Sequence, residues 1–388
     1  MKIFHLSDLH IGKQLHYYNL KENQQAVLHQ IVERAVEYAP DVILICGDIF
    51  DKSVPSAEAY TLFDDFLNEL SERVPGTPVL IIAGNHDSAQ RLNYASNFLE
   101  KHNIYVSVLP PQQPEEYLKK IELQDEWGSV YFYLLPFLKP GYVRHLFEDG
   151  VVTGYESAVR EILAREEIDY KQRNVLLSHQ FYTNGGEKPE LCDSESAVLT
   201  VGGLDNIDAS VVEQFDYVAL GHIHGAQMVK KPYIRYCGTP LKYSVSEEHH
   251  KKSITMVTLG RKGEEPIITT IPLIPIQEVR REKGLLKEII ARATEENRHD
   301  FISITMTDEK EPYNPKEQLE EVYDAILELR IENNRTRSLI EAEDELDIQL
   351  QPMEIFRSFY AEMNQQTISE EEEKIVAKII NQYEEGEV

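Results

Sequence analysis

The sequence predicts an α/β protein in which two β-sheets face each other and helices cover the outer side of each sheet. The first 275 residues or so alternate short apolar runs with amphipathic stretches, a pattern typical of strands joined by crossover helices. From about residue 230, strand-like runs follow one another, which indicates a second sheet. The chain has 388 residues, of which 42% are hydrophobic, enough for one large domain with smaller attachments.

The first strands and helices can be located from their patterns. Apolar residues recur at helical spacing in residues 23–38 and 56–70, which predicts two amphipathic helices. Buried strands are expected at residues 2–6, 42–46, 79–83, 175–177 and 217–220, and later strands between Gly, Pro and charged turns at 233–237, 253–259 and 267–273.

Residues 276–350 are expected to form a separate small α/β unit. Its predicted elements are a helix at 285–293, a strand at 301–307, a helix at 315–329 and a short strand near Leu339. After Pro352 the pattern becomes helical, with Ser369 as the expected N-cap of a second helix. The sequence therefore predicts three parts, residues 1–275, 276–350 and 351–388.

The sequence has features of a cytoplasmic protein. No apolar run approaches the ~20 residues that a membrane-spanning helix needs, and the N-terminus becomes polar too early for a signal peptide. The three cysteines, Cys46, Cys192 and Cys237, show no metal-binding or pairing pattern. They are expected to be ordinary reduced thiols.

Polar side chains that can bind metal follow the ends of five predicted strands. They lie in segments 8–10, 47–48, 84–87, 178–179 and 221–224. Because the carboxyl ends of strands in an α/β sheet meet at one edge, the five segments should converge on one crevice. Asp8 and His10 are two residues apart and should point the same way along an extended chain, as should His222 and His224.

The chemistry of these side chains predicts the kind of metal. Carboxylates, imidazoles and one amide, without a thiolate, favour Mn²⁺ or a similar ion over structural zinc. A bridging Asp48 could hold two ions ~4 Å apart, a separation at which they clamp a phosphodiester and activate a water. His86 would face the substrate. The seven candidate ligands are Asp8, His10, Asp48, Asn85, His179, His222 and His224.

Each segment also has a simpler interpretation. A lone buried His or Asp at a strand end is often a satisfied polar residue or a cap. Five such segments in chain order favour the metal interpretation. Other histidines, including His5, His249 and His250, lack this context and are expected to be structural or solvated.

The order D-x-H, G-D-x-x-D, G-N-H-D, H and G-H-x-H across residues 8–224 resembles the calcineurin-like metallophosphoesterases. Within that superfamily, segments 7–12, 47–51, 201–205 and 217–224 are similar to the recombination nucleases of bacteria, archaea and eukaryotes. The resemblance covers nearly the whole chain. It implies a four-layer helix-sheet-sheet-helix metallophosphoesterase sandwich in residues 1–275, a DNA-facing capping domain in 276–350 and a helical C-terminal tail in 351–388.

The resemblance also implies roles for individual residues. His86 would contact the scissile phosphate and help the leaving oxygen depart, and Asp51 would orient His86. Many archaeal and eukaryotic relatives have a histidine at the position of Asp51, which leaves its role open. Asp8, His10, Asp48 and His224 would hold one Mn²⁺, and Asp48, Asn85, His179 and His222 would hold the other.

The implied activity is that of a DNA nuclease. Such an enzyme would be a double-strand 3′–5′ exonuclease and a single-strand or hairpin endonuclease that processes DNA ends in recombination, repair and replication. The formal net charge of −28 is unusual for a chain that holds DNA by itself. The family works with a coiled-coil ATPase, which would supply the missing positive surface and dock on the tail helices. Those helices could instead pack on their own domain.

The family also implies a homodimer within a heterotetramer. The expected dimer helices are 56–70 and 88–102, with Phe63, Phe66, Leu92 and Phe98, although these apolar faces could simply cover the sheet.

Two other functions are compatible with the motifs. A metallophosphoesterase acting on nucleotides or other small phosphoesters would suit the acidic composition and need no partner. A non-catalytic scaffold would have lost its metals, which the complete ligand set argues against. Lys52-Ser53 stands where protein phosphatases of the superfamily have Arg-Gly, which argues against a phosphoprotein substrate.

Overall fold

The protein is described here from a computed structural model of the whole chain. The structure describes residues 1–195, 206–310, 312–334, 353, 356–357, 360, 368–369 and 372–376. Segment 201–205, the strand expected near Leu339 and most of the tail lie outside the described residues. At the described start of the second tail helix, the Ser369 hydroxyl accepts a hydrogen bond from the main-chain N–H of Glu372 at 3.4 Å, as an N-cap does.

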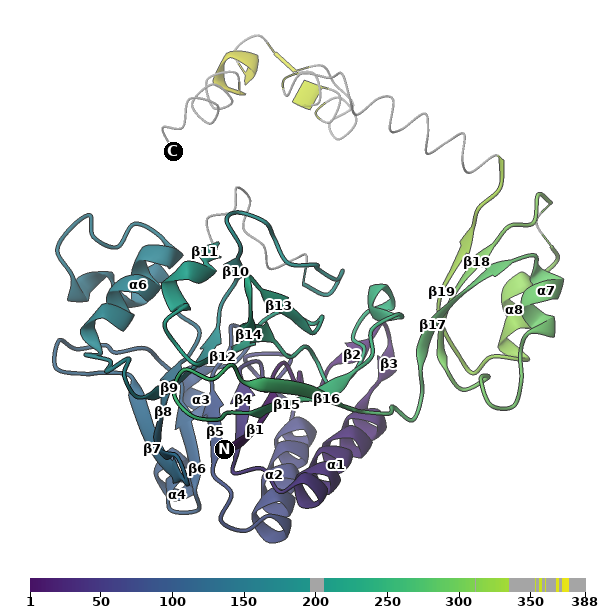
Figure 1. Cartoon of the computed structure of the whole chain (residues 1–388). Coiled ribbons are helices and arrows are strands. Elements are labelled where there is room, and N and C mark those ends of the chain that lie inside the picture. The colour runs from purple at the N-terminus through teal and green to yellow at the C-terminus, as the bar shows by residue number, and fades with distance from the viewer. Residues whose placement is uncertain are drawn as a thin grey trace. The chain divides into compact units, whose positions relative to one another are not determined.

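The first sheet has six strands in the order β16-β15-β1-β4-β5-β6 (Figure 1). β1, β4, β5 and β6 are parallel, whereas β15 and β16 extend the sheet in antiparallel fashion. Two long helices, α1 (Lys21–Tyr38) and α2 (Ala57–Arg73), bury apolar side chains against this sheet. The strands are β1 (Lys2–Leu6), β4 (Val42–Cys46), β5 (Val79–Ile82), β6 (Ile104–Ser107), β15 (Ser253–Thr258) and β16 (Ile267–Pro272).

The second sheet also has six strands, in the order β13-β14-β12-β9-β8-β7. Its four central strands are parallel, and β7 and β13 form antiparallel edges. Helix α6 (Tyr155–Arg165) covers its outer face. The strands are β7 (Lys119–Asp125), β8 (Gly128–Leu135), β9 (Arg173–His179), β12 (Tyr217–Gly221), β13 (Gln227–Val229) and β14 (Lys231–Tyr236).

The two sheets pack face to face on a shared apolar layer. Ile3 and Leu44 of the first sheet lie in this layer with Phe132 and Val175 of the second, all fully buried. Separate apolar clusters lie under α1 and α2 and under α6. The four layers are therefore helix, sheet, sheet and helix, and the predicted fold class is confirmed.

Short elements connect the layers. The short elements are β2 (Gln14–Leu15), β3 (Tyr18–Asn19), α3 (Ala89–Leu92), α4 (Ser96–Glu100), α5 (Pro140–Val143), η1 (Arg144–Leu146), β10 (Tyr182–Thr183), β11 (Ile207–Asp208), η3 (Ala209–Val212) and η4 (Val245–Glu247).

None of the helices in the described part of the chain combines the length and apolarity that a membrane crossing needs. The three cysteines are buried and free.

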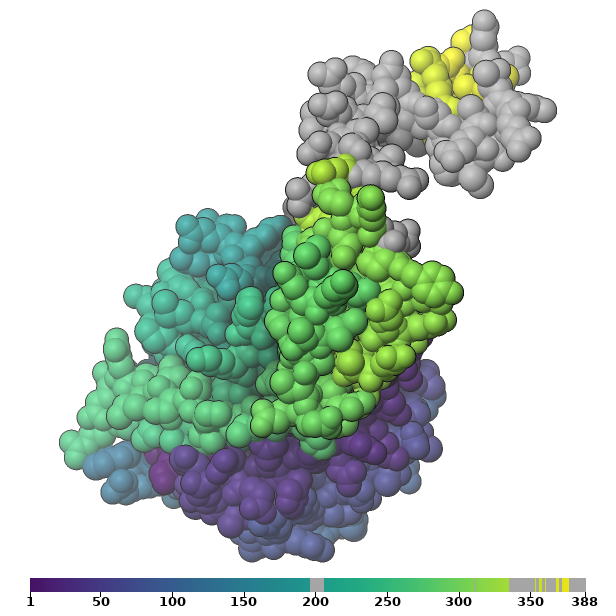
Figure 2. All heavy atoms as spheres, turned by 90° about the vertical axis from the view of Figure 1, so that its right-hand side faces the viewer, coloured from purple at the N-terminus to yellow at the C-terminus, as the bar shows by residue number. Residues whose placement is uncertain are grey.

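A smaller three-stranded sheet follows, with the order β17-β18-β19. Its strands are β17 (Val279–Gly284), β18 (Phe301–Met306) and β19 (Ala325–Ile331), accompanied by α7 (Leu286–Ala291) and α8 (Pro315–Glu320), coloured green to yellow-green in Figure 2. The chain divides into two compact units. One comprises Met1–Arg281, Thr294–Ser303 and Tyr323–Leu327, and the other Glu282–Ala293, Ile304–Val322 and Glu328–Val388.

Two predicted helices differ from the structure. The helix expected at 315–329 ends at Glu320, and residues 325–331 form β19 instead, because Ala325 and Leu327 alternate with less buried positions at the period of a strand. The helix expected at 88–102 is broken into α3 and α4 at Ala95, whose φ is 60°. Of the apolar residues expected at a dimer interface, Phe63, Phe66 and Leu92 are buried in this chain and Phe98 is 62% exposed.

Candidate metal centre

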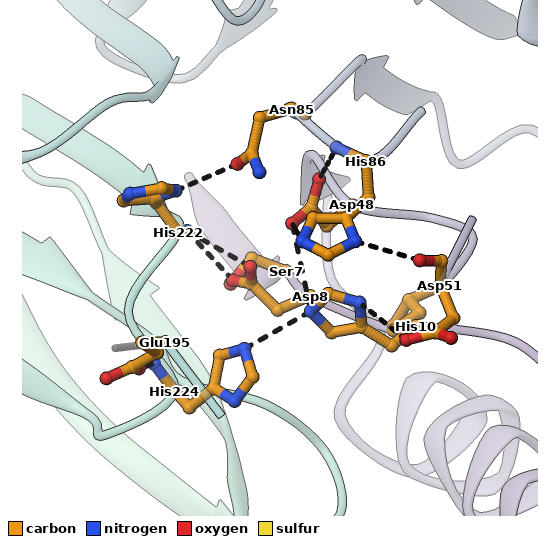
Figure 3. Close-up of polar contacts among 12 residues, drawn as sticks. Ser7, Asp8, His10, Asp48, Asp51, Asn85, His86, Glu195, His222 and His224 are labelled. Carbon is orange, nitrogen blue, oxygen red and sulfur yellow. Dashed lines mark hydrogen bonds and ion pairs between the residues drawn. The ribbon is translucent and has the colours of Figure 1, made fainter. Parts of the chain in front are cut away.

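The predicted site residues lie at the ends of five strands or in the loops that follow them: β1, β4 and β5 of the first sheet and β9 and β12 of the second. Main-chain hydrogen bonds join the first two loops, since the N–H of Asp8 donates to Gly47 at 2.9 Å and that of His10 donates to Asp48 at 3.0 Å. The loops of both sheets bring their side chains together in one site (Figure 3). The predicted convergence is therefore confirmed, although two sheets rather than one contribute.

Glycine at two strand ends permits this close approach. A Cβ atom on Gly47, whose φ is 89°, would lie 2.2 Å from Nδ1 of His179. A Cβ atom on Gly221 would lie 1.9 Å from the carbonyl oxygen of Cys46. Any larger residue would push the end of one sheet away from the other.

The ligand side chains are aimed by unusual backbone rather than by strand alternation. Asp8, His10, Asp48 and His222 have φ values of 53°, 42°, 49° and 102°, in the left-handed region that non-glycine residues rarely adopt. Such residues are strained by about 1–3 kcal/mol each and cluster at functional sites. The expected alternation along an extended chain was therefore wrong for the backbone, and His222 and His224 reach different partners, Asn85 and His10.

One group of candidate ligands contains Asp8, His10 and His224, whose ligand atoms all lie within 4.8 Å of one another. The Nε2 atoms of His10 and His224 face each other at 3.2 Å (Figure 3). The Asp8 carboxylate accepts the main-chain N–H of His222 at 3.0 and 3.1 Å, which holds it toward the second sheet. Asp48 borders this group, with Oδ2 3.7 Å from Nε2 of His10.

A second group contains Asp8, Asp48 and His179, again within 4.8 Å of one another. Nε2 of His179 lies 3.4 Å from Oδ2 of Asp48 and 3.1 Å from Oδ1 of Asn85. Nδ1 of His222 approaches the same Asn85 oxygen at 2.9 Å. The seven predicted ligands therefore come together in two adjoining groups, with Asp48 in contact with both.

The ring nitrogens that carry no proton indicate that these groups suit cations. Nδ1–H of His179 donates to the carbonyl of Cys46 at 2.7 Å, so the neutral ring presents a lone pair at Nε2 to the oxygens of Asp48 and Asn85. Acceptors that face acceptors are repulsive unless a proton or a metal lies between them. Nδ1 of His10 is also buried and has no hydrogen-bond partner among the described residues.

The pKa values of the candidate ligands reflect two opposing effects, burial and the charges of neighbouring side chains. Burial raises the pKa of Asp8, and His179 offsets this only partly. Burial would also raise the pKa of Asp48, but His179 beside it holds the pKa well below its usual range. Burial opposes the charged form of His179, but Asp48, with Asp8 and the bond to Cys46, raises its pKa to about 9. Burial lowers the pKa of His222 to about 3. One proton thus occupies the second group when no metal is bound, and a metal would displace it.

His86 lies beside both groups, with a ring nitrogen within 4.8 Å of ligand atoms of His10 and Asp48. Its Nδ1–H donates to the main-chain carbonyl of Asp51 at 2.8 Å, and its main-chain N–H donates to Oδ1 of Asp48 at 2.9 Å. Nε2 of His86 therefore faces the centre, 3.9 Å from Oδ2 of Asp48, and the side chain is 30% exposed. The Asp51 carboxylate instead accepts from Lys13 at 2.8 Å and lies 3.9 Å from Nδ1 of His10.

The structure adds supporting residues that no motif indicated. The Ser194 hydroxyl donates to Glu247 at 3.0 Å and so accepts from Nδ1–H of His224 at 2.9 Å, which leaves Nε2 of His224 unprotonated. Glu247 is fully buried and pairs with Lys252 at 2.5 Å. Burial opposes ionisation of Glu247, but Lys252 and His224 hold its pKa well below the usual value. These residues lie far from the motifs in sequence, so only the folded structure brings them together.

Asp87, the last residue of the G-N-H-D motif, ties two of the loops together. Its carboxylate accepts main-chain N–H groups of Gly84 at 2.9 Å, Ile49 at 3.1 Å and Phe50 at 3.0 Å. Burial raises its pKa to about 6 despite these bonds. The residue thereby fixes Asp48 and Asn85 relative to each other without binding metal itself.

Comparisons with known proteins agree with this site. Residues 1–226 match the calcineurin-like phosphoesterase family, and residues 275–364 match the type 5 capsule protein repressor C-terminal domain. The chain is 30% identical to the SbcD subunit of the SbcCD nuclease of Staphylococcus epidermidis over 376 residues, which covers 95% of each chain. Solved structures with fainter likeness include TT1561 of Thermus thermophilus, at 12% identity over 69% of this chain and 98% of that one with a TM-score of 0.39. A dimetal phosphatase from Danio rerio has 14% identity over 70% of this chain and 98% of that one, with a TM-score of 0.36.

The four-layer fold and the paired ligand groups define a metal-dependent phosphoesterase, and the chain belongs to the calcineurin-like phosphoesterase family. Within that family it is a homologue of the SbcD nucleases over nearly its full length.

Proposed function

We propose that the protein is a Mn²⁺-dependent DNA nuclease, acting as a double-strand 3′–5′ exonuclease and a single-strand or hairpin endonuclease. The observation that carries the proposal is the meeting of two ligand groups at Asp48 with the partly exposed His86 beside them. Two divalent ions bound there would polarise a phosphodiester and lower the pKa of a bound water. Likeness to a protein named as a nuclease supports nucleic acid as the substrate class.

The ligands are assigned from their contacts. Asp48 is shared by the two sites because it lies close to both His10 and His179. The first site would take Asp8, His10, Asp48 and His224, and the second Asp48, Asn85, His179 and His222. Mn²⁺ fits this set of carboxylate, imidazole and amide ligands without a thiolate.

His86 is proposed to contact the scissile phosphate and assist the leaving oxygen. The bond from Nδ1–H to the carbonyl of Asp51 fixes the ring so that Nε2 faces the centre. A group in that position can donate a hydrogen bond or a proton to an oxygen that gains charge in the transition state.

Asp51 contributes in two ways. Its main-chain carbonyl orients His86, as the expected carboxylate would have done. Its carboxylate lies on the far side of His10, where it can stabilise the Nδ1–H of that ring when Nε2 is engaged by a metal. Lys13 holds this carboxylate in place.

The chain is proposed to work as the nuclease subunit of an ATP-dependent complex that processes DNA ends and hairpins in recombination, repair and replication. Residues 1–275 would form the nuclease domain, 276–350 the DNA-facing capping domain and 351–388 the helical tail that binds an SbcC-type coiled-coil ATPase. The net charge of −28 supports a partner that contributes positive surface. Such a complex would act in the cytoplasm.

A homodimer within a heterotetramer is also proposed. Phe63, Phe66 and Leu92 are committed to the core of this chain, so contacts between two copies would depend on exposed neighbours. Phe98 and Tyr94 are 62% and 84% exposed and supply apolar surface in the α3–α4 region.

Cleavage assays on two substrates test the function. The wild-type chain, alone and with its ATPase partner, would be given a labelled DNA hairpin and a small chromogenic phosphodiester with Mn²⁺ or with EDTA. The hairpin should be cut only with Mn²⁺, and His86→Ala should lose that cutting. Activity confined to the small diester would contradict the proposal and favour an enzyme of small phosphoesters.

A further inference from the structure

A cavity of about 570 Å³ lies at the open edge of the sheet sandwich. Its walls include Arg235 of β14, Ser253 at the start of β15, and Thr270 and Pro272 of β16. β16 is the edge strand of the first sheet, and β15 and β14 are each second from the edge of their sheets (Figure 1). None of the seven candidate metal ligands lines the cavity. The cavity therefore lies beside the metal ligands and not among them, and Lys252 on its wall donates to the main-chain carbonyl of His224.

The sequence pattern places Arg235 between the sheets. Its neighbours Ile234 and Tyr236 lie in the apolar cluster on the outer face of the second sheet, so strand alternation directs Arg235 to the inner face. Thr255 pairs with Thr270 across the first sheet, on the face that Val257 uses to contact the second sheet. The inner space is thus apolar at its centre and polar at this edge.

Arg235 has no partner in this space. The structure gives its guanidinium no hydrogen bond or ion pair with any described residue, and its Nε is buried and unpartnered. Oγ1 of Thr255, on the facing sheet, is likewise buried without a partner among the described residues. The guanidinium is half-buried, and a buried donor nitrogen without an acceptor is unfavourable. An anion from outside the chain would complete the site.

The remaining charges around the cavity leave it positive. Four cationic side chains line it, Arg235, Lys242, Lys251 and Lys252, against two carboxylates. Lys242 pairs with Glu278 at 2.5 Å, and Lys252 pairs with Glu247 at 2.5 Å. Glu248 pairs with Arg281 at 3.1 Å.

Arg235 and Lys251 remain without an ion pair among the described residues, and Lys251 is exposed. The cavity is thus positive although the net charge of the chain is −28. Two unpaired positive charges match a phosphate monoester, which carries about −1.5 to −2 at neutral pH.

We propose that this cavity binds a phosphate-bearing small molecule of nucleotide size, with Arg235 holding the phosphate and the apolar wall contacting the organic part. That wall contains Leu20, Leu273, Val279 and Phe301, all buried. An arginine presents a planar fork of N–H groups that suits phosphate. A volume of this size falls within the range of about 300–1,000 Å³ typical of small-molecule sites.

Calorimetric titration of the full-length chain tests the site with three probes: adenosine 5′-monophosphate, inorganic phosphate and adenosine. EDTA keeps the metal centre from contributing a phosphate site. The monophosphate should bind with one site per chain and more tightly than phosphate, and adenosine should not bind. Equal affinity for phosphate and monophosphate would overturn the role of the apolar wall, and no binding of either anion at about 10 mM would overturn the site.

Variants make the assignment specific. Arg235→Met should weaken binding of the monophosphate at least about tenfold, because it removes a charge-assisted fork. The matched control is Arg261→Met, since that guanidinium stacks on Trp127 at 4.3 Å away from the cavity and its loss should leave binding unchanged. Unchanged binding in Arg235→Met would refute the proposal.

Thermal unfolding without added anion separates binding from a structural role. Removing a half-buried guanidinium that has no partner among the described residues should leave the melting temperature of Arg235→Met equal or higher. If Arg235 served packing alone, that variant would melt lower and bind the monophosphate as the wild type does. With Mn²⁺ present, Arg235→Met should lose one of two monophosphate sites and keep the one at the metal centre.

Discussion

The His86 ring is held by a main-chain carbonyl rather than by a side chain. This contact, from Nδ1–H to Asp51 at 2.8 Å, does not depend on what residue 51 carries beyond its Cα. It gives a physical reason why relatives can have a histidine at this position. The Asp51 side chain instead lies near His10 and Lys13.

Asp51→Asn should therefore reduce DNA cleavage by less than about tenfold, far less than the 10²–10⁴-fold expected for loss of a general acid. The substituted amide can still accept from Lys13. Steady-state cleavage of a hairpin substrate by Asp51→Asn and His86→Ala, measured side by side, checks this. Equal losses in the two variants would show that the carboxylate, and not the carbonyl, positions His86.

Glu247 and Lys252 form a buried ion pair beside His224. Lys252 donates to the main-chain carbonyl of His224, and Glu247 accepts from Ser194, which contacts the His224 ring. Glu247→Gln should destabilise the protein by about 3–5 kcal/mol, because it leaves a buried ammonium without its counterion. It should also weaken Mn²⁺ binding about 10–100-fold through the loss of support for His224. Urea unfolding and Mn²⁺ titration measure the two effects. The exposed Glu265→Gln serves as control, and equal behaviour of the two variants would contradict the supporting role.

At the scale of elements, the site depends on how closely the ends of β4 and β12 approach. Gly221→Ala would place a Cβ 1.9 Å from the carbonyl oxygen of Cys46. Such overpacking should destabilise the protein by about 1–3 kcal/mol or more and lower Mn²⁺ affinity, because the loops of the two sheets separate.

Gly141→Ala is the matched control, since nothing lies within 4 Å of its added Cβ. It should be neutral or slightly stabilising. Urea unfolding and Mn²⁺ titration of both variants give the comparison. A Gly221→Ala protein as stable as Gly141→Ala would mean that the sheet ends can separate without cost to the site.

The strand-end pattern made most of the site predictable from sequence. Each predicted ligand lies at or just after the end of a buried strand, and parallel strands end at one edge, so convergence within each sheet follows from topology. The meeting of the two sheets at one site comes from their packing. The aiming of Asp8 and His10 could not be predicted, because their left-handed backbone comes from tertiary hydrogen bonds between loops. Glu247 and Lys252 carry no motif and reach His224 only through folding.

The predicted type of an element was wrong where the local sequence pattern and tertiary strand pairing favoured different structures. Residues 325–331 have helix-forming Ala, Leu and Glu, yet they pair as the edge strand β19. Tertiary pairing outweighs such propensities, which amount to a few tenths of a kcal/mol per residue. The Arg235 cavity was also outside prediction, because its walls come from strands far apart in sequence.

At the scale of the whole molecule, the charge of −28 and the acidic tail bear on assembly. Two described parts of the tail contact each other, since Arg357 pairs with Glu373 and the Tyr360 hydroxyl donates to Glu372 at 3.0 Å. These contacts suit a helical pair that presents one face to a partner.

Deleting residues 353–388 should leave Mn²⁺-dependent hairpin cutting by the isolated chain within about threefold and abolish co-purification with the coiled-coil ATPase, since an apolar helix face supplies much of such an interface. Co-expression with a tagged ATPase and pull-down measures association, and the hairpin assay on the isolated chain is the control. Undiminished co-purification would refute the role of the tail.

The central claim is that one carboxylate, Asp48, is shared by two metal sites and that His86 binds neither ion. Counting bound Mn²⁺ by native mass spectrometry in the wild type, Asp48→Ala and His86→Ala tests it most directly. We predict two ions per chain in the wild type and in His86→Ala, and none in Asp48→Ala. A fully occupied site in Asp48→Ala, or loss of an ion in His86→Ala, would contradict the account.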